Sequence, residues 1–406
     1  MRGPDFDVIV LGGGIAGAAL ARSLSAGGRL KLALVEARAV DTSGPRTAAV
    51  ESPADFDSRV SAITPASQRI LQAMDAWDAI EATRLCPYTH MQVWDADGTG
   101  QIDFAAGEVD APALGHIIEN RIINAALTQG LDHRAGVSLL APARLAALDV
   151  DDNHVTVTLE GGEQVGAKLL VAADGALSRV RQLADFRTRE WDYGHTALVT
   201  TVETTLQHRS TAYQRFLSSG PLAFLPLPSQ GGRNFSSIVW SSEADVAEEL
   251  MALEDAEFQR AIAAALEHRL GEVIACAPRV AFPLRQRHAV DYVKPRIALV
   301  GDAAHTIHPL AGQGINLGIS DIAVLSEVLA AALARAEDLG SLAVLRRYQR
   351  QRKGENLAMM AAMDGFKRLF AERALPLRWA RNRGMDWVSR SGPVKQQIMR
   401  QAMGLR

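Results

Sequence analysis

The sequence is poor in the features that mark several other classes of protein. Its 406 residues include two cysteines, Cys86 and Cys276, which lie 190 positions apart and form no CxxC pair. Such a pair suits a reducing cytoplasm and argues against a disulfide scaffold or a cysteine metal cluster. No apolar run approaches the ~18–20 residues that a membrane span needs. Asp5 and Asp7 precede a short strand that runs into glycines, so we expect no signal peptide.

Charge is present, but it is unevenly distributed. The formal net charge is −3, yet residues 366–406 carry 10 Lys/Arg against 2 Asp/Glu, whereas the other 365 residues carry 33 against 44. With 48% apolar and 22% charged residues, the chain has the composition of an ordinary globular protein with room for two domains. We therefore expect an acidic body with a strongly basic tail, and no nucleic-acid partner.

The first sixty residues follow a characteristic order of elements. Residues 7–11 read as a buried parallel strand that enters the turn Gly12–Gly17, which has the pattern GxGxxG. A helix over 18–26 follows, and a second strand, 32–35, ends at Glu36. This order of strand, glycine turn, helix, strand and acid predicts a dinucleotide-binding site.

Each residue of this pattern has a physical role. Gly12 permits the tight turn, Gly14 lets the backbone approach a pyrophosphate, and Gly17 lets the helix pack close to the strand. The helix N-terminus offers free N–H groups and a positive dipole end to the phosphates. Glu36 would accept hydrogen bonds from the adenosine ribose hydroxyls. By itself, the pattern leaves both FAD and NAD open.

A second glycine-rich segment lies near the other end of the chain. Residues 296–300 read as another buried strand, followed by Gly301 and Asp302 and then by a loop that reaches Gly318. Residues 319–334 have helical periodicity, so a second loop leads into a second helix N-terminus, which suits an anionic or electron-rich group. A strand–loop–helix unit for each end of the ligand suits FAD, the longer dinucleotide.

The motifs of this segment carry a family resemblance. The Gly301-Asp302 pair resembles the GD motif of the class A flavoprotein monooxygenases. The string from His308 to Asp321, HPLAGQGINLGISD, resembles the signature of the ubiquinone-biosynthesis hydroxylases within that class. The resemblance implies that Asp302 bonds the ribityl hydroxyls of FAD and that N–H groups of the loop stabilise the reduced flavin. The residues that it places along the flavin ring are Pro309, Gly312, Gly314, Ile315 and Asn316.

Three more residues match positions of the same family. Asp174, in an acid–glycine pair at a strand end, resembles the DG motif, whose Asp lies near the FAD pyrophosphate in a region that also serves the nicotinamide donor. Arg59 and Arg121 lie in segments that match those in which an arginine approaches the flavin or the FAD phosphates. Without the resemblance, the acid–glycine pair is usually only a turn, and each arginine could instead form a surface salt bridge.

The predicted fold class is α/β, a Rossmann-like FAD-binding fold with an interleaved antiparallel-sheet substrate domain and a C-terminal helical segment. Alternating stretches at 197–202 and 235–240 read as the antiparallel strands. Pro376 is expected to break the C-terminal helix in two. The predicted parts are an FAD-binding domain of residues 1–80, 101–182 and 279–350, a substrate domain of 81–100 and 183–278, and a helical basic segment of 351–406.

The resemblance implies an FAD-dependent monooxygenase that hydroxylates the aromatic ring of a polyprenylated phenol or quinol intermediate in ubiquinone biosynthesis. NAD(P)H would be the electron donor and O2 the co-substrate, with a flavin C4a-hydroperoxide placing one oxygen atom on the ring. Because the cofactor carries the difficult chemistry, we assign no catalytic side chain. His305 and His308 have a spacing close to that of metal ligands, but they lack obvious carboxylate or thiol partners, and we expect no metal.

Other functions are compatible with parts of the pattern. A hydroxylase of a small soluble aromatic acid would share the fold, and a non-catalytic scaffold of a quinone-synthesis complex would share it without holding flavin. A flavin disulfide reductase would need a redox cysteine pair near the first helix, and a tryptophan halogenase would need a WxWxIP string. The sequence has neither.

The basic tail has two interpretations. Its Lys and Arg residues, with Trp379 and Trp387, indicate contact with an anionic membrane surface or a quinone-synthesis complex, which would bring the site to a lipid-borne substrate. In the other interpretation, apolar residues such as Phe366 and Leu369 let the tail cap the core. On the first interpretation, the protein is cytoplasmic and lies peripherally at the inner membrane face.

Overall fold

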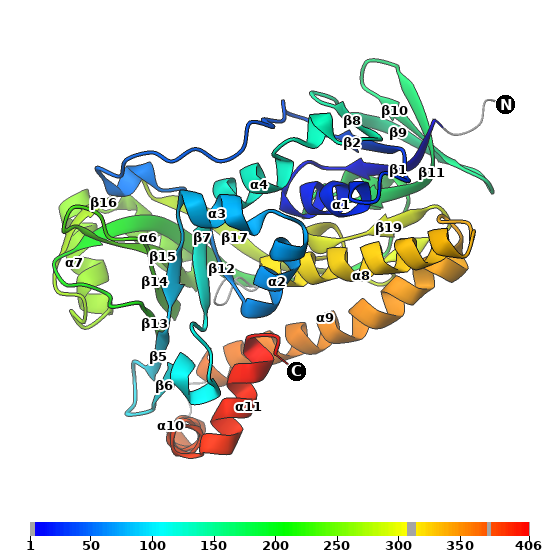
Figure 1. Ribbon diagram of the computed structural model, residues 1–406. Coiled ribbons are helices and arrows are strands. Elements are labelled where there is room, and N and C mark those ends of the chain that lie inside the picture. The colour runs from blue at the N-terminus through cyan, green and yellow to red at the C-terminus, as the bar shows by residue number, and fades with distance from the viewer. Residues whose placement is uncertain (1–4, 307–313, 372–374, 406) are drawn as a thin grey trace.

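The fold is that of a computed structural model, which describes residues 5–306, 314–371 and 375–405. It has two β-rich parts joined by the long strands β12 (Thr188–Thr204) and β17 (Val280–Ala289) (Figure 1). The helices α8 (Gly314–Ala334) and α9 (Leu342–Ala371) run beneath the first part, and the chain ends in helices beside the second.

The first sheet has a parallel core. Its strand order is β18-β19-β11-β1-β2-β8, and every pair from β19 to β8 is parallel, while β10 pairs antiparallel with β11 and β9 antiparallel with β10. The central strand is buried from Val8 to Leu11, because its side chains are apolar on both faces. The bounds are β1 Phe6–Leu11, β2 Leu32–Val35, β8 Val137–Leu140, β9 Leu145–Val150, β10 Val155–Leu159, β11 Gln164–Ala172, β18 Val293–Lys294 and β19 Ile297–Leu299.

Helices cover this sheet. The first of them, α1, packs against both α4 and α8, and α8 packs in turn against α9. These contacts enclose the largest apolar core of the described residues. The remaining helices of this part are short. The bounds are α1 Ile15–Ser25, α2 Pro65–Ala73, α3 Trp77–Thr83, α4 Asn120–Thr128 and α5 Arg179–Leu183, with 3₁₀ turns η1 Pro53–Asp55, η2 Ala106–Val109, η3 Leu131–His133 and η4 Gly301–Ala303.

The second sheet is larger and mostly antiparallel. Its order is β20-β17-β12-β15-β14-β13-β5-β6, with β16 paired to β12. The helices α6 and α7 pack on one face, and an apolar cluster with Phe235 and Leu225 covers the other. The bounds are β5 His90–Asp95, β6 Gln101–Ala105, β13 Thr211–Leu217, β14 Gly220–Pro226, β15 Asn234–Glu243, β16 Val273–Cys276, β20 His305–Thr306, α6 Ala244–Ala252 and α7 Asp255–Ala265.

A small sheet lies between the two parts. It has the order β3-β7-β4, with bounds Val60–Ile63, Gly115–Glu119 and Cys86–Tyr88. The α/β fold class, the antiparallel second sheet and the helical C-terminal segment are thus as predicted. Sheet membership differs from the predicted division at three places. Residues 101–105, 280–289 and 305–306, which the sequence assigned to the FAD-binding fold, are strands of the second sheet.

One helix departs from the expectation that no segment is apolar enough to span a membrane. By length and composition α8 could do so, with a mean hydropathy of 1.8 over its most apolar stretch. Half of that stretch is buried inside the protein, and Asp321 on the same helix is fully buried in ion pairs. These contacts are those of a core helix, whose apolar side chains pack against α1 and α9.

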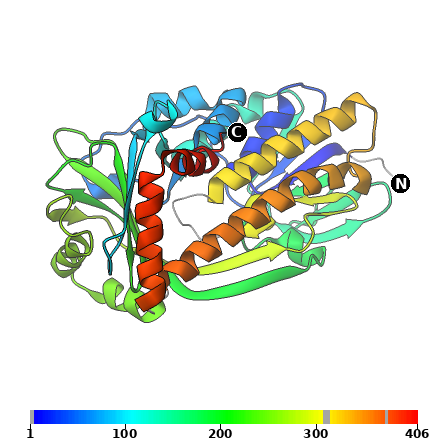
Figure 2. The same cartoon turned by 90° about the horizontal axis from the view of Figure 1, so that it is seen from below.

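The C-terminal segment is helical and broken. After α9 ends at Ala371, α10 (Leu375–Arg390) begins next to Pro376, as predicted, and α11 (Gly392–Ala402) follows. Figure 2 shows α9 crossing the molecule and leading to α10 beside the second sheet. The segment packs on the body, because Met399 and Met403 belong to the apolar cluster beneath that sheet.

Candidate cofactor site

The glycine turn after β1 is shaped by steric contacts. Gly12 has φ +105°, and a Cβ atom there would collide with the carbonyl oxygen of Ala173. A Cβ atom at Gly17 would overlap the carbonyl oxygen of Gly12. Gly14 is different, because a Cβ atom there would meet no protein atom within 4 Å. Packing therefore requires two of the three glycines, while the third faces open space of the kind that a ligand phosphate needs.

The N-terminus of α1 lies at this open space. Gly14 is its N-cap residue, and no side chain caps the helix. The first N–H groups of α1 are therefore free to bind an anion, and the helix dipole favours negative charge there. Glu36, which follows β2, lies beside the turn. It accepts a hydrogen bond from the Gly13 N–H at 2.6 Å and another from the Arg38 N–H at 3.1 Å. It thus anchors the turn and keeps lone pairs for a ribose.

Asp174 lies next to the same turn, just after the neighbouring strand β11. Its Oδ2 accepts hydrogen bonds from the N–H groups of Arg179 (2.7 Å) and Val180 (3.2 Å) at the start of α5. Its Oδ1 is buried and has no hydrogen-bond partner among the described residues. Burial raises the pKa of this carboxyl, against the hydrogen bonds that lower it. A buried oxygen without a partner is unfavourable, so a donor from a ligand fits here.

Asp302 comes from the far end of the chain to the same region. It lies in η4, directly after β19, and its neighbour Gly301 faces α1, because a Cβ atom added at Gly301 would lie 3.4 Å from the Ala16 Cβ. The Asp302 side chain is exposed by area but surrounded by protein, which raises the pKa of its carboxyl, against the charges of His305 and Arg59 that lower it. This combination is that of an acid lining a recess.

The two predicted arginines lie at the junction of η1, β3, β7 and α4. Arg59 is exposed, and its positive charge lowers the pKa of the Asp302 carboxyl. The backbone carbonyl of Arg59 accepts a hydrogen bond from the Asn120 N–H at 2.9 Å. Arg121 forms an ion pair of 2.7 Å with Glu119, and its side chain is 53% exposed. Arg59 therefore faces the region of Asp302, whereas Arg121 is partly engaged by the protein itself.

The start of α8 supplies Gly314, Ile315 and Asn316. The Asn316 side chain is buried, donates to the Ala62 carbonyl at 2.8 Å and accepts from the Thr64 N–H at 3.1 Å. The Asn316 amide therefore fastens α8 to β3, and only its backbone remains for a cofactor. Pro309 and Gly312 lie outside the described residues.

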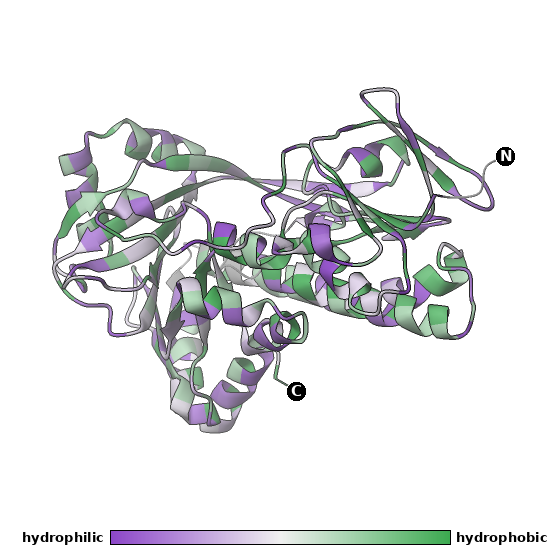
Figure 3. Ribbon diagram, turned by 45° about the horizontal axis from the view of Figure 1, so that its top comes forward, coloured by the Kyte–Doolittle hydropathy of each residue, from purple (hydrophilic) through white to green (hydrophobic). Residues whose placement is uncertain are grey.

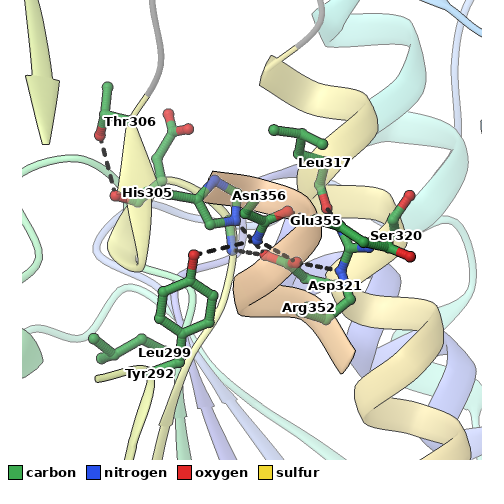
Figure 4. Close-up of polar contacts among 12 residues, drawn as sticks. Tyr292, Leu299, His305, Thr306, Leu317, Ser320, Asp321, Arg352, Glu355 and Asn356 are labelled. Carbon is green, nitrogen blue, oxygen red and sulfur yellow. Dashed lines mark hydrogen bonds and ion pairs between the residues drawn. The ribbon is translucent and has the colours of Figure 1, made fainter. Parts of the chain in front are cut away.

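A buried network that the sequence did not predict supports this half of the site (Figure 4). Asp321 accepts hydrogen bonds from His305 Nε2 at 2.6 Å and Arg352 Nε at 2.8 Å. It also accepts from the Gly301 N–H at 3.1 Å, so the network holds the turn that carries Asp302. Asn356 Nδ2 completes it at 3.2 Å. The expectation that His305 lacks a carboxylate partner is wrong, because Asp321, about two helical turns into α8, bonds to it.

The protonation of this network follows from its charges. Burial by itself would raise the pKa of Asp321, but His305 and Arg352 lower it below the usual value, so the group stays a carboxylate. His288 lies at the edge of the network, with its Nε2 3.0 Å from the Tyr292 hydroxyl, and burial lowers the pKa of His288 to about 4.

The sequence carries one signal of this network. The α9 residues Arg352 and Asn356 are one helical turn apart, and that i, i+4 polar pair could have revealed them.

Three features of the site bear on whether its residues fit FAD. The uncapped helix start at Gly14, the partnerless oxygen of Asp174 and the recessed carboxylate of Asp302 come from three segments of the chain. The contact between Gly301 and Ala16 brings the segments after β1 and β19 together. One elongated ligand with phosphates and several hydroxyls fits this set.

The chain is similar to known proteins in both sequence and structure. A family profile described as "FAD binding domain" matches residues 5–362. The 3-demethoxyubiquinol 3-hydroxylase of Escherichia coli (strain K12) is 38% identical over 98% of this chain and 98% of its own length. The ubiquinone hydroxylase UbiL of Rhodospirillum rubrum is 39% identical over 98% of this chain and 89% of its own. The solved structure of p-nitrophenol 4-monooxygenase PnpA from Pseudomonas putida DLL-E4 has a TM-score of 0.78 at 20% identity, covers 100% of both chains and shows the same fold.

Proposed function

Because this chain belongs to the family of FAD-dependent hydroxylases of ubiquinone biosynthesis, we propose that it hydroxylates the aromatic ring of a polyprenylated phenol or quinol intermediate. One atom of O2 enters the ring and the other leaves as water, with two electrons from NAD(P)H. The FAD cofactor, as predicted, supplies the redox chemistry when bound. The protein works in the cytoplasm, in contact with the inner membrane face, where such a substrate is held.

The convergence of the segments after β1 and β19 at Ala16 and Gly301 carries this proposal. The start of α1 would bind the FAD pyrophosphate, with Glu36 on the adenosine ribose and Asp302 on the ribityl chain. The N–H groups at the start of α8 would face the flavin ring and favour negative charge on it. The Asp321 network keeps the Asp302 turn in place for this task.

The second sheet favours an apolar substrate over a small aromatic acid. Alternation along β12, β13, β14 and β15 puts one set of side chains toward the apolar cluster around Phe235. Near Phe235, that face carries Val199, Thr201, Ala223, Leu225 and Ser237, with no Lys or Arg of these strands among the described residues there, and its acid Glu203 pairs with Arg233. A carboxylate substrate would need a cation there. A ring with a hydrocarbon tail does not.

The decisive experiment compares substrates on the purified FAD-loaded protein. NAD(P)H oxidation is followed with a phenol that bears a short prenyl chain and, as the matched control, with para-hydroxybenzoate, and labelled O2 is traced into product. We expect the prenylated phenol to stimulate oxidation and to gain one labelled oxygen atom. Equal turnover of the small acid would favour the alternative hydroxylase, and a protein that purifies without flavin would favour the scaffold.

A further inference from the structure

The outer surface of α10 carries large apolar side chains in water. Trp379 is 65% exposed and Trp387 60%, whereas Arg381 and Met385 on the opposite side of the helix are buried. Isolated exposed apolar residues are common, but exposed tryptophans gathered on one short helix are not. Figure 3 shows hydrophilic and hydrophobic bands alternating along the C-terminal helices.

The spacing of these residues makes a defined face. Trp379, Arg383, Trp387 and Arg390 are separated by four, four and three positions, which puts them on one stripe of an α-helix. The Arg383 guanidinium lies 5.3 Å from the centre of the Trp379 ring. The stripe, called here the outer face of α10, therefore carries two aromatic rings and two arginines, with the half-buried Asp386 at its margin.

The positive charges of the segment divide into two sets. On the inner side, Arg381 pairs with Asp95 at 2.5 Å and Lys395 with Glu108 at 2.7 Å. These bonds hold the basic tail to the acidic body. Arg383 and Arg390, on the outer face, are exposed and form no ion pair with any described carboxylate.

We propose that the outer face of α10 docks on the surface of an anionic bilayer. Tryptophan rings are favoured at the level of the lipid headgroups, and arginines beside them are attracted to anionic lipid, so their combination on one helix face suits a helix lying in the plane of the interface. The inner ion pairs neutralise the charge that faces the body, which leaves the outer charge to meet lipid of the opposite sign.

This docking would bring the second sheet to the membrane. The helix packs against β6, and Asn382 accepts from the Gly100 N–H at 2.5 Å. Phe370, at the end of α9, stacks on Phe216 of β13 at 3.7 Å between ring centres. The tail thus need not detach in order to act. The purpose of docking, delivery of a lipid-borne substrate to this sheet, rests on the proposed function, whereas the docking itself does not.

Vesicle co-sedimentation of the full-length FAD-loaded protein tests the inference. The vesicles are phosphatidylcholine alone or phosphatidylcholine with phosphatidylglycerol, at low and at high salt. The variants are R383Q/R390Q and W379A/W387A, with R260Q and W191A as matched controls, because Arg260 and Trp191 are exposed on other elements. Hydroxylation of a short-chain phenol without vesicles is measured for each protein.

We expect the parent protein to bind the anionic vesicles and to lose binding at high salt. R383Q/R390Q should bind about thirtyfold more weakly, about fivefold for each arginine, which corresponds to about 1 kcal/mol each. W379A/W387A should bind more weakly on both kinds of vesicle, and the controls should match the parent. Unchanged hydroxylation without vesicles would show that these variants fold and act normally.

The inference is overturned if the parent protein does not co-sediment with the anionic vesicles, or if both double variants bind these vesicles as tightly as the parent does. The first result would assign the outer face to a protein partner. If the parent protein binds the vesicles but does not hydroxylate the phenol, the proposed function is contradicted and the docking inference still stands. The two failures are therefore distinguishable.

Discussion

The two ends of the candidate cofactor site are built by opposite means. At the first end, Gly12 and Gly17 leave out side chains for which there is no room, and the start of α1 has no side-chain cap. At the second end, Asp321 gathers His305 and Arg352 into a buried charged network that fixes the Asp302 turn. The comparison shows that a local glycine motif is enough to indicate where side chains must be missing. A buried charge network cannot be identified in this way, because its partners are distant in sequence.

Asp321→Asn should give the largest effect. The change leaves His305 and Arg352 as buried cations without their carboxylate, and breaking a buried pair in this way costs about 3–5 kcal/mol. We expect a lower Tm and weaker FAD retention, measured by thermal unfolding and flavin absorbance. Glu355→Gln is the matched control, because Glu355 pairs with the same Arg352 from the surface. A similar loss in both variants would contradict the importance of burial.

Gly17→Ala and Gly14→Ala should separate packing from ligand binding. The first adds a methyl group that overlaps the Gly12 carbonyl, so we expect destabilisation at or above the upper end of the about 1–3 kcal/mol that overpacking costs. The second adds a methyl group into open space, so the protein without flavin should keep its Tm while FAD binds more weakly. Urea unfolding of apoprotein and FAD titration provide the two measurements. A stable apoprotein in the Gly17 variant would refute the steric account.

Asp302→Ala tests the second end without disturbing its support. The Asp302 side chain makes no hydrogen bond within the described residues, in contrast to Asp321. Loss of this side chain should therefore leave the apoprotein stable and weaken FAD binding by about 1.5–3 kcal/mol, or roughly ten- to hundredfold in affinity. Isothermal titration with FAD gives the affinity. Unchanged affinity would remove Asp302 from the site.

His288→Gln tests how the stability of the protein near the second end of the site depends on pH. Burial depresses the pKa of His288 to about 4, below the ~6.5 of an unfolded histidine, so the unfolded state binds more protons between these values. The full stability should therefore be present above about pH 6.5 and fall by about 3 kcal/mol as the pH drops toward about 4. The variant should flatten this slope in urea titrations at stepped pH. An unchanged slope would show that other groups cause the acid loss.

Much of the fold follows from local patterns. The continuous apolar run of β1, the glycine turn and the alternating residues of β12 and β15 predicted the parallel and antiparallel sheets. Boundaries were harder. Residues 101–105 look like any short strand, and only their pairing with β5 assigns them to the second sheet.

The site was predicted unevenly for the same reason. Gly12, Gly14 and Gly17 act through their own backbone, so the motif by itself indicates what each does. Asn316 matches a family string just as well, yet its amide is engaged by Ala62 and Thr64, some 250 positions away. Those partners lie far from Asn316 along the chain, so the sequence did not reveal them, and the place of Asn316 at the flavin ring stays a prediction.

The sequence by itself therefore determined the glycine turn and the basic character of the tail, because each depends on residue types at short spacing, and two distant motifs with their family resemblance indicated FAD. Tertiary structure alone decided which acids are buried, which arginines are already paired and which face of α10 remains outside. Those properties depend on neighbours that the fold supplies, such as Asp95 for Arg381 and Asp321 for His305. Burial strengthens such pairs and exposure weakens them, and a linear sequence records neither.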